Sequence, residues 1–163
     1  MTLTTHSIIA AAVTKPLARM HPAFILIAAV TSHYLSDAIP HWDYKIVSLE
    51  NPEDKEKRHL TKDHNLISQD IRNFAIDGFV GAAIVLLVIR PVTQQQWTWA
   101  VLAIIGGCLP DFLQGLYVFK IKSLGLHQIF HDLFHTKIQL GPYPMLGIPM
   151  QAAIALIALV LLL

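Results

Sequence analysis

The sequence predicts an all-α integral-membrane protein, a helical bundle of four to five spanning helices with one amphipathic helix at the membrane interface. Of its 163 residues, 54% are apolar and only 14% are charged, whereas an average soluble domain has about 25% charged residues. Two stretches, 84–89 and 154–163, are apolar on every face of a helix. The whole chain, 1–163, is expected to form a single membrane domain. The alternative is a very hydrophobic soluble helical domain, because apolar runs of about 10 to 14 residues also form core helices.

Five segments approach the length of a spanning helix, about 20 residues, once mildly polar flanks are included. They are residues 5–18, 21–39, 73–89, 96–116 and 147–163. The first is short and weakly apolar, so the expected number of spans is four to five. Residues 40–70 are the one long hydrophilic stretch, and their mixed charges predict a solvated cytoplasmic loop. Residues 123–137 predict the amphipathic interfacial helix, since their histidines and apolar residues fall on opposite faces.

Basic residues predict the orientation in the membrane. Nine of the 12 Lys and Arg residues lie on the side of the bundle that holds the 40–70 loop, and three lie on the other side. Cytoplasmic loops carry an excess of these residues, so we expect the first side, with the N-terminus, to face the cytoplasm. No basic residue precedes the first apolar stretch and Lys15 follows it, unlike in a signal peptide.

Composition excludes several function classes. A net charge of +1 argues against a nucleic-acid partner, because nucleic-acid modules are strongly basic. The single cysteine, Cys108, cannot form an internal disulfide or a thiolate metal cage. Membrane lipid is the expected partner, and the sequence specifies no oligomeric state. Nine histidines in so charge-poor a chain point to a specific polar site.

An internal duplication is suggested by two parallel pieces of chain. Residues 6–13 match 77–84, and the turn 38–42 matches the turn 108–112. Each turn contains a proline, which is expected to end the preceding helix. The pattern therefore predicts that His41 and Asp111 lie just past helix ends. An up-down helix pair would place His6 near His41 and Asp77 near Asp111, all at the cytoplasmic face. Asp77 opens an apolar stretch, and ionisable groups in such segments are usually functional.

Histidines and aspartates also recur at short spacings. The patterns are His33-x-x-x-Asp37, the turn with His41 and Asp43, and the series His127, His131 and His135. Side chains four apart lie on one face of a helix, one turn from each other, so an imidazole and a carboxylate can share an ion. Imidazole and carboxylate ligands without thiolate suit zinc, or manganese or iron, rather than calcium.

These patterns lead to the hypothesis of a metal-dependent hydrolase of phosphoester bonds at the membrane surface. The expected metal ligands are His6, His33, Asp37, His41, Asp77, His131 and His135. Asp111 or Asp43 would orient or deprotonate the attacking water. With more than four candidate ligands, two or three ions could be bridged by shared aspartates, which is the arrangement that promotes displacement at phosphorus. The expected substrate is a lipid head group or a similar phosphoester.

The motifs resemble those of the membrane-bound metal-dependent hydrolases, small bacterial inner-membrane proteins that are in turn similar to the helical zinc-dependent phospholipase C class. The matching motifs are Thr5-His6, His33-x-x-x-Asp37, Pro40-His41-Trp42-Asp43, Leu109-Pro110-Asp111 and His131-x-x-x-His135. The resemblance implies a zinc-dependent, phospholipase C-like activity in a cell inner membrane. Leu113 departs from the family pattern, which has a second aspartate there, and the paired histidines are one residue closer together.

Two alternatives come from other classes. A non-enzymatic membrane protein with a metal or proton site, such as a transporter subunit or an assembly factor, would also need intramembrane polar groups. A protein whose histidines are purely structural is the other. An ion pathway requires polar residues throughout the helices, whereas 84–89 and 152–163 contain none. The distribution favours a surface site.

Overall fold

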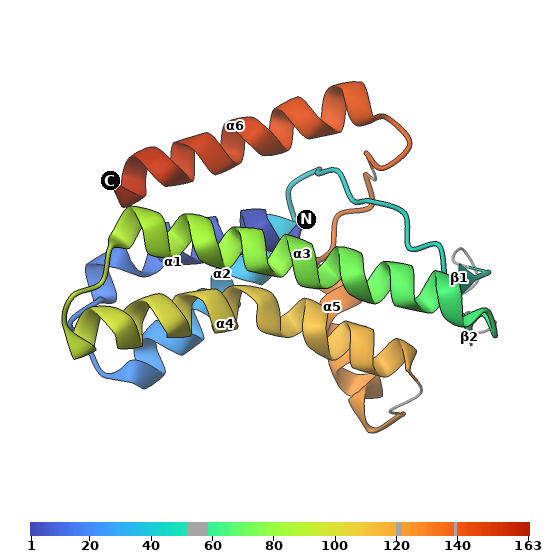
Figure 1. Cartoon of the computed structure of the whole chain (residues 1–163), viewed down its shortest axis with the longest axis horizontal. Helices are drawn as coiled ribbons and strands as arrows, with labels where there is room; N and C mark the ends of the chain where they lie inside the picture. The colour runs from blue at the N-terminus through green and yellow to red at the C-terminus, as the bar shows by residue number, and fades with distance from the viewer. Residues whose placement is uncertain (52–58, 120–121, 139) are drawn as a thin grey trace.

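The computed structural model is a bundle of helices, and it describes residues 1–51, 59–119, 122–138 and 140–163. The helices are α1 (Leu3–Thr14), α2 (Pro22–Asp37), α3 (His64–Ile89), α4 (Gln94–Val118), α5 (Gly125–Phe134) and α6 (Pro144–Leu162), with short 3-10 turns at Lys15–Leu17 and Lys122–Leu124. Two short strands, β1 (Leu49–Glu50) and β2 (His59–Leu60), pair antiparallel. The all-α prediction is confirmed (Figure 1).

Local sequence signals explain where the long helices begin and end. Asp63 accepts a hydrogen bond from the backbone N–H of Asn65 and so caps α3. At the other end of α3, Arg90 adopts a left-handed conformation with φ 49°, which stops the helix. Thr93 and Gln96 form a reciprocal capping box at the start of α4. These two ends make the tight connection between α3 and α4.

Among the described residues, three helices are long and apolar enough to cross a membrane: α3, α4 and α6. The prediction of four to five spans is therefore wrong. At about 1.5 Å per residue, the 12 residues of α1 and the 16 of α2 reach about 18 and 24 Å, whereas the hydrocarbon core is about 30 Å thick. The predicted segments were longer because they counted flanking residues that form the 3-10 turn after α1 and the chain after Asp37.

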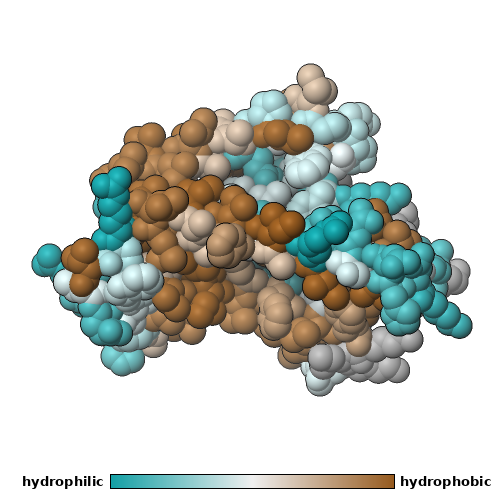
Figure 2. All heavy atoms as spheres, in the orientation of Figure 1, coloured by the Kyte–Doolittle hydropathy of each residue, from teal (hydrophilic) through white to brown (hydrophobic). Residues whose placement is uncertain are grey.

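The apolar surface of the molecule matches these three helices. Figure 2 shows a broad hydrophobic face over the C-terminal half of α3 and the N-terminal half of α4, with hydrophilic surface beyond both ends. On the outside of α6, Leu156 is 62% exposed and Val160 is 71% exposed. Large apolar patches of this kind are unfavourable in water and are expected against lipid.

Helix α1 lies at the centre of the bundle, in contact with α2, α3, α4 and α6 (Figure 1). The buried core around it is built from Ile8, Ala11, Ile25, Val85, Trp99, Ala103, Ala158 and Leu162. Because α1 is enclosed by other helices, it needs no lipid contact and can be short. Its N-terminus, with Thr5 and His6 buried, lies in the interior of the protein.

Two sequence-based boundaries are corrected by the structure. The predicted loop over 40–70 ends earlier, because α3 begins at His64 after its cap at Asp63; residues 52–58 of that loop lie outside the described residues. Pro110 does not end a helix, since α4 continues through it to Val118. A proline inside a helix removes one backbone hydrogen bond but does not prevent the helix from continuing when packing holds both sides.

The amphipathic helix expected over 123–137 corresponds to α5, Gly125–Phe134. Its inner face places His131 and Gln128 in the protein interior. Its outer face carries Leu126 and Leu133, which are 80% and 76% exposed. The helix thus covers the buried polar groups on one side and presents apolar side chains on the other.

Candidate metal centre

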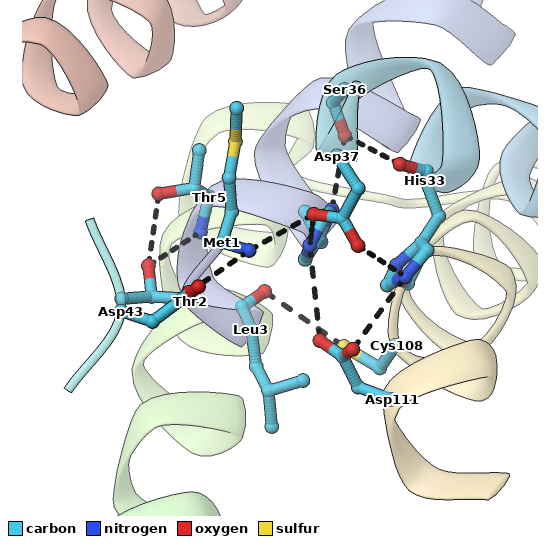
Figure 3. A network of polar contacts seen from close by, with 12 residues as sticks. Met1, Thr2, Leu3, Thr5, His33, Ser36, Asp37, Asp43, Cys108 and Asp111 are labelled. Carbon is cyan, nitrogen blue, oxygen red and sulfur yellow. Dashed lines mark hydrogen bonds and ion pairs between the residues drawn. The ribbon is translucent and has the colours of Figure 1, made fainter. Parts of the chain in front are cut away.

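Histidines and aspartates from three helices converge on one buried point. His6 comes from α1, His33 and Asp37 from the C-terminal half of α2, and Asp111 from the middle of α4. Each offers one ligand atom, and these atoms lie within 4.8 Å of one another, so the group could hold a metal ion. Figure 3 shows the Asp37 and Asp111 carboxylates approaching the imidazoles from opposite sides.

The contacts inside this group are short. The Nε2 atom of His6 lies 3.1 Å from Oδ1 of Asp37, and Nε2 of His33 lies 3.2 Å from Oδ2 of the same carboxylate. Asp111 is slightly farther, at 3.7 Å from His6 and 3.6 Å from His33. From α5, Nε2 of His131 reaches within 3.4 Å of Asp111 and 3.5 Å of Asp37. His131 therefore borders the same group.

A second group shares Asp37 with the first. It consists of Asp37, His41 and His135, again with ligand atoms within 4.8 Å of one another. Asp43 adjoins it: its Oδ2 lies 3.0 Å from Nε2 of His41 and 3.8 Å from Nε2 of His135. Because a carboxylate has two oxygens, Asp37 can contribute to both groups.

Two glycines allow α4 to come close enough for Asp111 to reach the other helices. A Cβ on Gly106 would lie 2.6 Å from Cβ of Ala29, and a Cβ on Gly107 would lie 2.8 Å from the carbonyl oxygen of His6. Real Cβ atoms do not approach so closely, so only glycine fits at these positions. The close packing brings Asp111, one turn further along α4, to the imidazoles of α1 and α2.

In three of these imidazoles, those of His33, His41 and His6, the second ring nitrogen is held by an oxygen of the protein. Nδ1 of His33 lies 2.8 Å from the Gly107 carbonyl oxygen, and Nδ1 of His41 lies 2.7 Å from that of Ile39. Nδ1 of His6 lies 3.1 Å from the Ser36 hydroxyl oxygen, which itself donates to the carbonyl of His33 at 2.8 Å. Each oxygen is thus an acceptor that fixes the ring proton on Nδ1. The Nε2 lone pairs then face the carboxylates, which is the orientation found in metal-ligating histidines.

Electrostatics keeps His6, Asp37 and Asp43 in the forms that bind cations, whereas burial of His33 is outweighed by its contacts with Asp37 and Asp111, which raise its pKa. Burial, the nearby amino group of Met1 and His33 lower the pKa of His6 to about 4, so its imidazole is neutral at pH 7. Burial alone would raise the pKa of Asp37, but the imidazoles of His33 and His6 outweigh it and hold that pKa well below its usual range. The same balance, with His41 as the partner, holds the pKa of Asp43 low. A neutral imidazole and an ionised carboxylate each present a lone pair.

Several of these facing atoms have no hydrogen bond in the described part of the chain. They are Nε2 of His6, Nε2 of His41 and Oδ2 of Asp37, all fully buried. The amino group of Met1 donates to the other oxygen of Asp37 at 2.9 Å, but it leaves these atoms unpartnered. Buried polar groups without partners cost on the order of 1–3 kcal/mol each. A cation among them would remove that cost, so the residues present fit a metal ion.

The structure brings together most, but not all, of the predicted site residues. His6, His33, Asp37, His41 and His135 belong to the two groups, and His131 borders them. His6 and His41 lie close together, as expected, because both contact Oδ1 of Asp37. Asp111, predicted to act on water, instead lies among the ligands of the first group. Asp43 is the more exposed carboxylate, with 44% of its side chain accessible.

Asp77 has a different role from the one predicted and belongs to neither group. Its carboxylate accepts hydrogen bonds from the backbone N–H groups of Leu3 at 2.7 Å and Thr4 at 3.1 Å. These N–H groups open α1 and have no partner within the helix. A carboxylate there also interacts favourably with the positive end of the helix dipole. Asp77 therefore fixes the start of α1, which positions His6.

Sequence reasoning missed the groups that orient the ligands, Ser36 and the carbonyls of Ile39 and Gly107. Ser36 could have been found, because it lies next to Asp37 within the His33-x-x-x-Asp37 turn. The carbonyls carry no sequence signal, since every residue has one. No family model, curated protein or solved structure matches this chain. A function for this protein therefore has to be inferred from the geometry of the site.

Proposed function

We propose that this protein is a membrane-bound, zinc-dependent hydrolase of phosphoester bonds that acts at the membrane surface. The observation that carries the proposal is the buried cluster of imidazoles and carboxylates in which Nε2 of His6, Nε2 of His41 and Oδ2 of Asp37 have no hydrogen bond in the described part of the chain. Nitrogen and oxygen ligands without thiolate suit zinc. Manganese and iron accept the same ligand types and are the other metals to test.

Two ions fit the ligand arrangement. His6, His33, Asp37 and Asp111 would hold the first, with His131 beside them. The second would be held by Asp37, His41 and His135, with Asp43 close to His41. Two ions bridged by a carboxylate stabilise both the attacking and the leaving oxygens of a displacement at phosphorus.

Asp43 is the residue best placed to act on the attacking water. It lies at the edge of the second group and its side chain is 44% accessible. Partial loss of hydration would raise its pKa, but contacts with His41 and with the Met1 amino group, 3.1 Å away, outweigh this and hold the pKa low. An ionised carboxylate at this position accepts a hydrogen bond from water and orients it. Asp111 borders the same cavity as Asp43, and as a ligand it would fix the position of the reacting group rather than take its proton.

A membrane-surface substrate is supported by the surroundings of the site. The outward face of α5, with Ile129 61% exposed and Leu133 76% exposed, has the character of a helix that lies in the interface with its apolar side in the lipid. The inward face of the same helix contributes His131. A phosphoester at headgroup depth would therefore lie next to the cluster.

The protein is a candidate three-span membrane protein. The proposal also includes the membrane that it spans and the side of that membrane on which the site lies. The α1–α2 connection, which carries Lys15 and Arg19, and the α3–α4 connection, which carries Arg90, lie at the end of the bundle opposite β1 and β2 (Figure 1). Of the other basic residues that the structure describes, Lys45 and Lys62 lie between α2 and α3, Arg72 lies in the N-terminal half of α3, and Lys137 follows α5. The excess of positive charge supports a cytoplasmic site in a cell inner membrane.

Metal analysis of the purified protein tests the proposal. Protein reconstituted in nanodiscs is expected to retain about two equivalents of zinc and to hydrolyse a p-nitrophenyl phosphodiester. His33→Ala should lose both properties, because His33 contacts both Asp37 and Asp111. His64→Ala is the matched control, since His64 is exposed and lies at the start of α3. Protein that takes up no zinc, manganese or iron would refute the proposal, and metal binding without hydrolysis would favour a non-enzymatic metal site.

A further inference from the structure

A cavity of about 210 Å³ opens next to the candidate metal centre. At one end it is lined by Asp43, Asp111 and His135, which belong to or adjoin the two ligand groups. Away from them, its walls are mainly apolar, with the polar residues Ser48, Asp70 and Gln114 also among the lining. The walls come from the N-terminal half of α3 with Ile71 and Phe74, from the C-terminal end of α4, and from the β1–β2 segment.

The apolar wall formed by the β1–β2 segment is held in place by a buried carboxylate. Asp70 accepts hydrogen bonds from the backbone N–H groups of Val47 at 3.2 Å and Ser48 at 2.7 Å. Leu49 pairs with Leu60 across the two strands, and both side chains line the cavity. Because polar contacts fix the backbone, the apolar side chains of this wall are left facing the cavity.

We infer that this cavity binds an alkyl chain of the substrate while the phosphoester lies at the metal centre. The inference rests on the proposed function and adds the class of substrate, an alkyl phosphoester. No lysine or arginine lines the described part of the cavity, so an anionic group has its partners only at the metal end. An apolar chain gains by burial against the other walls. The polar and apolar ends of the cavity thus match the two ends of an amphiphile.

The cavity volume sets the length of chain that fits. A cavity of about 150 Å³ lined by apolar side chains binds benzene, with its six carbons. By the same ratio, 210 Å³ holds roughly eight carbons. Burial of one methylene is worth about 0.8 kcal/mol, or about fourfold in affinity. Affinity is therefore expected to rise with chain length up to roughly eight carbons and then to level off.

Gly115 offers a way to fill the cavity without disturbing the site. It lines the cavity from α4, and a Cβ built there meets no atom within 4 Å. Replacement of a helical glycine by a residue with a side chain also favours the helix. Gly115→Phe should therefore fold and occupy the space, and Gly115→Ala, which adds only one carbon, is the matched control. Val118→Phe fills the same cavity from the next turn and is the second variant.

The test measures binding and hydrolysis separately, with protein in nanodiscs so that no detergent enters the cavity. Calorimetry compares octylphosphonate with methylphosphonate, neither of which has a phosphoester bond to cleave. Zinc-loaded wild type and Gly115→Ala are expected to bind octylphosphonate at least about 100-fold more tightly, a conservative value for seven further methylenes at up to about fourfold each. Gly115→Phe and Val118→Phe should reduce the preference to less than about tenfold. Methylphosphonate binding should stay unchanged.

Hydrolysis of p-nitrophenyl octyl phosphate, added from solution, is measured in the same discs. Release of head group from the phospholipids of the disc is measured alongside, to distinguish a soluble amphiphile from a bilayer lipid as the source of the chain. An equal affinity for both phosphonates, or a preference that both Phe variants leave intact, would overturn the inference. A chain-length preference without any hydrolysis would overturn the proposed activity but support the alkyl-chain site.

Discussion

Replacement of Asp37 by asparagine is expected to weaken both metal sites at once. Asp37 contacts His6 at 3.1 Å, His33 at 3.2 Å and His41 at 3.7 Å, and it belongs to both ligand groups. Asparagine keeps the shape of the side chain but removes the negative charge and one of the two ligand oxygens. Loss of a partner that only orients a metal ligand already costs about 10- to 100-fold in affinity. For a shared ligand we expect at least the upper end of that range.

The size of the effect can be followed by thermal unfolding. A metal held at about 1,000 times its Kd stabilises the folded protein by about 4.1 kcal/mol, and a 100-fold weaker site at the same zinc concentration leaves about 1.4 kcal/mol. For a chain of 150 to 250 residues, 1 kcal/mol corresponds to roughly 2–4 °C in Tm. Each of the two ions should therefore raise the Tm of the wild type by roughly 8–16 °C and that of Asp37→Asn by roughly 3–6 °C, so two ions together should give about twice these rises.

The assay compares Tm with and without zinc for both proteins in nanodiscs. Asp63→Asn is the matched control, because Asp63 is an exposed carboxylate that caps α3, and asparagine caps helices equally well. Its zinc-dependent rise should equal that of the wild type. An Asp37→Asn protein with the same rise as the wild type would show that no metal is shared at this carboxylate, and the two-ion arrangement would have to be abandoned.

Three further predictions test the framework around the cluster. Asp77→Asn should lower the free energy of unfolding of the zinc-free protein by about 1 kcal/mol, measured by chemical unfolding, because it weakens the cap of α1. The number of bound zinc ions should not change. A loss of one zinc ion would instead make Asp77 a ligand. Gly107→Ala should lower the free energy of unfolding by about 1–3 kcal/mol and weaken zinc binding, because its Cβ would lie 2.8 Å from the His6 carbonyl oxygen. An unchanged zinc affinity would contradict the close packing of α4 against α1. Zinc uptake by the metal-free protein should release more protons at pH 7 than at pH 9. Burial lowers the pKa of His33, but its contacts with Asp37 and Asp111 outweigh burial and raise that pKa, so zinc has to displace a proton from the imidazole. Proton release that does not depend on pH would argue against His33 as a ligand.

The helices themselves could be predicted from the sequence, apart from their ends. Continuous apolar runs are local signals, and they located α3, α4 and α6. The caps Asp63 and Thr93 are local signals too, but the predicted segments began at residues 73 and 96, inside α3 and α4. The number of spans was wrong for two reasons. Helix α1 is apolar because other helices enclose it, and composition does not distinguish that surrounding from lipid. Helix α2 keeps exposed apolar side chains such as Phe24 and Ile27, but with 16 residues it is too short to cross the membrane.

Part of the cluster was also predictable. The spacing of His33 and Asp37 places both on one face of α2 whatever the rest of the chain does. The closeness of His6 and His41 followed from the expected helix pairing, and in the structure both contact Asp37. Asp77 was misassigned because a carboxylate at the end of an apolar stretch has the same sequence signature whether it binds a metal or caps a neighbouring helix.

The sequence alone determined that this chain is helical, that it is suited to a membrane, and which side chains carry metal-binding chemistry, because periodicity, hydropathy and residue type are local properties. Only the tertiary structure decided which of those side chains share a point in space, that Asp37 stands between two ligand groups, and that an apolar cavity adjoins them. Those features depend on how closely helices distant in sequence approach one another. That approach is set by small residues such as Gly107, whose partner surface no local pattern identifies.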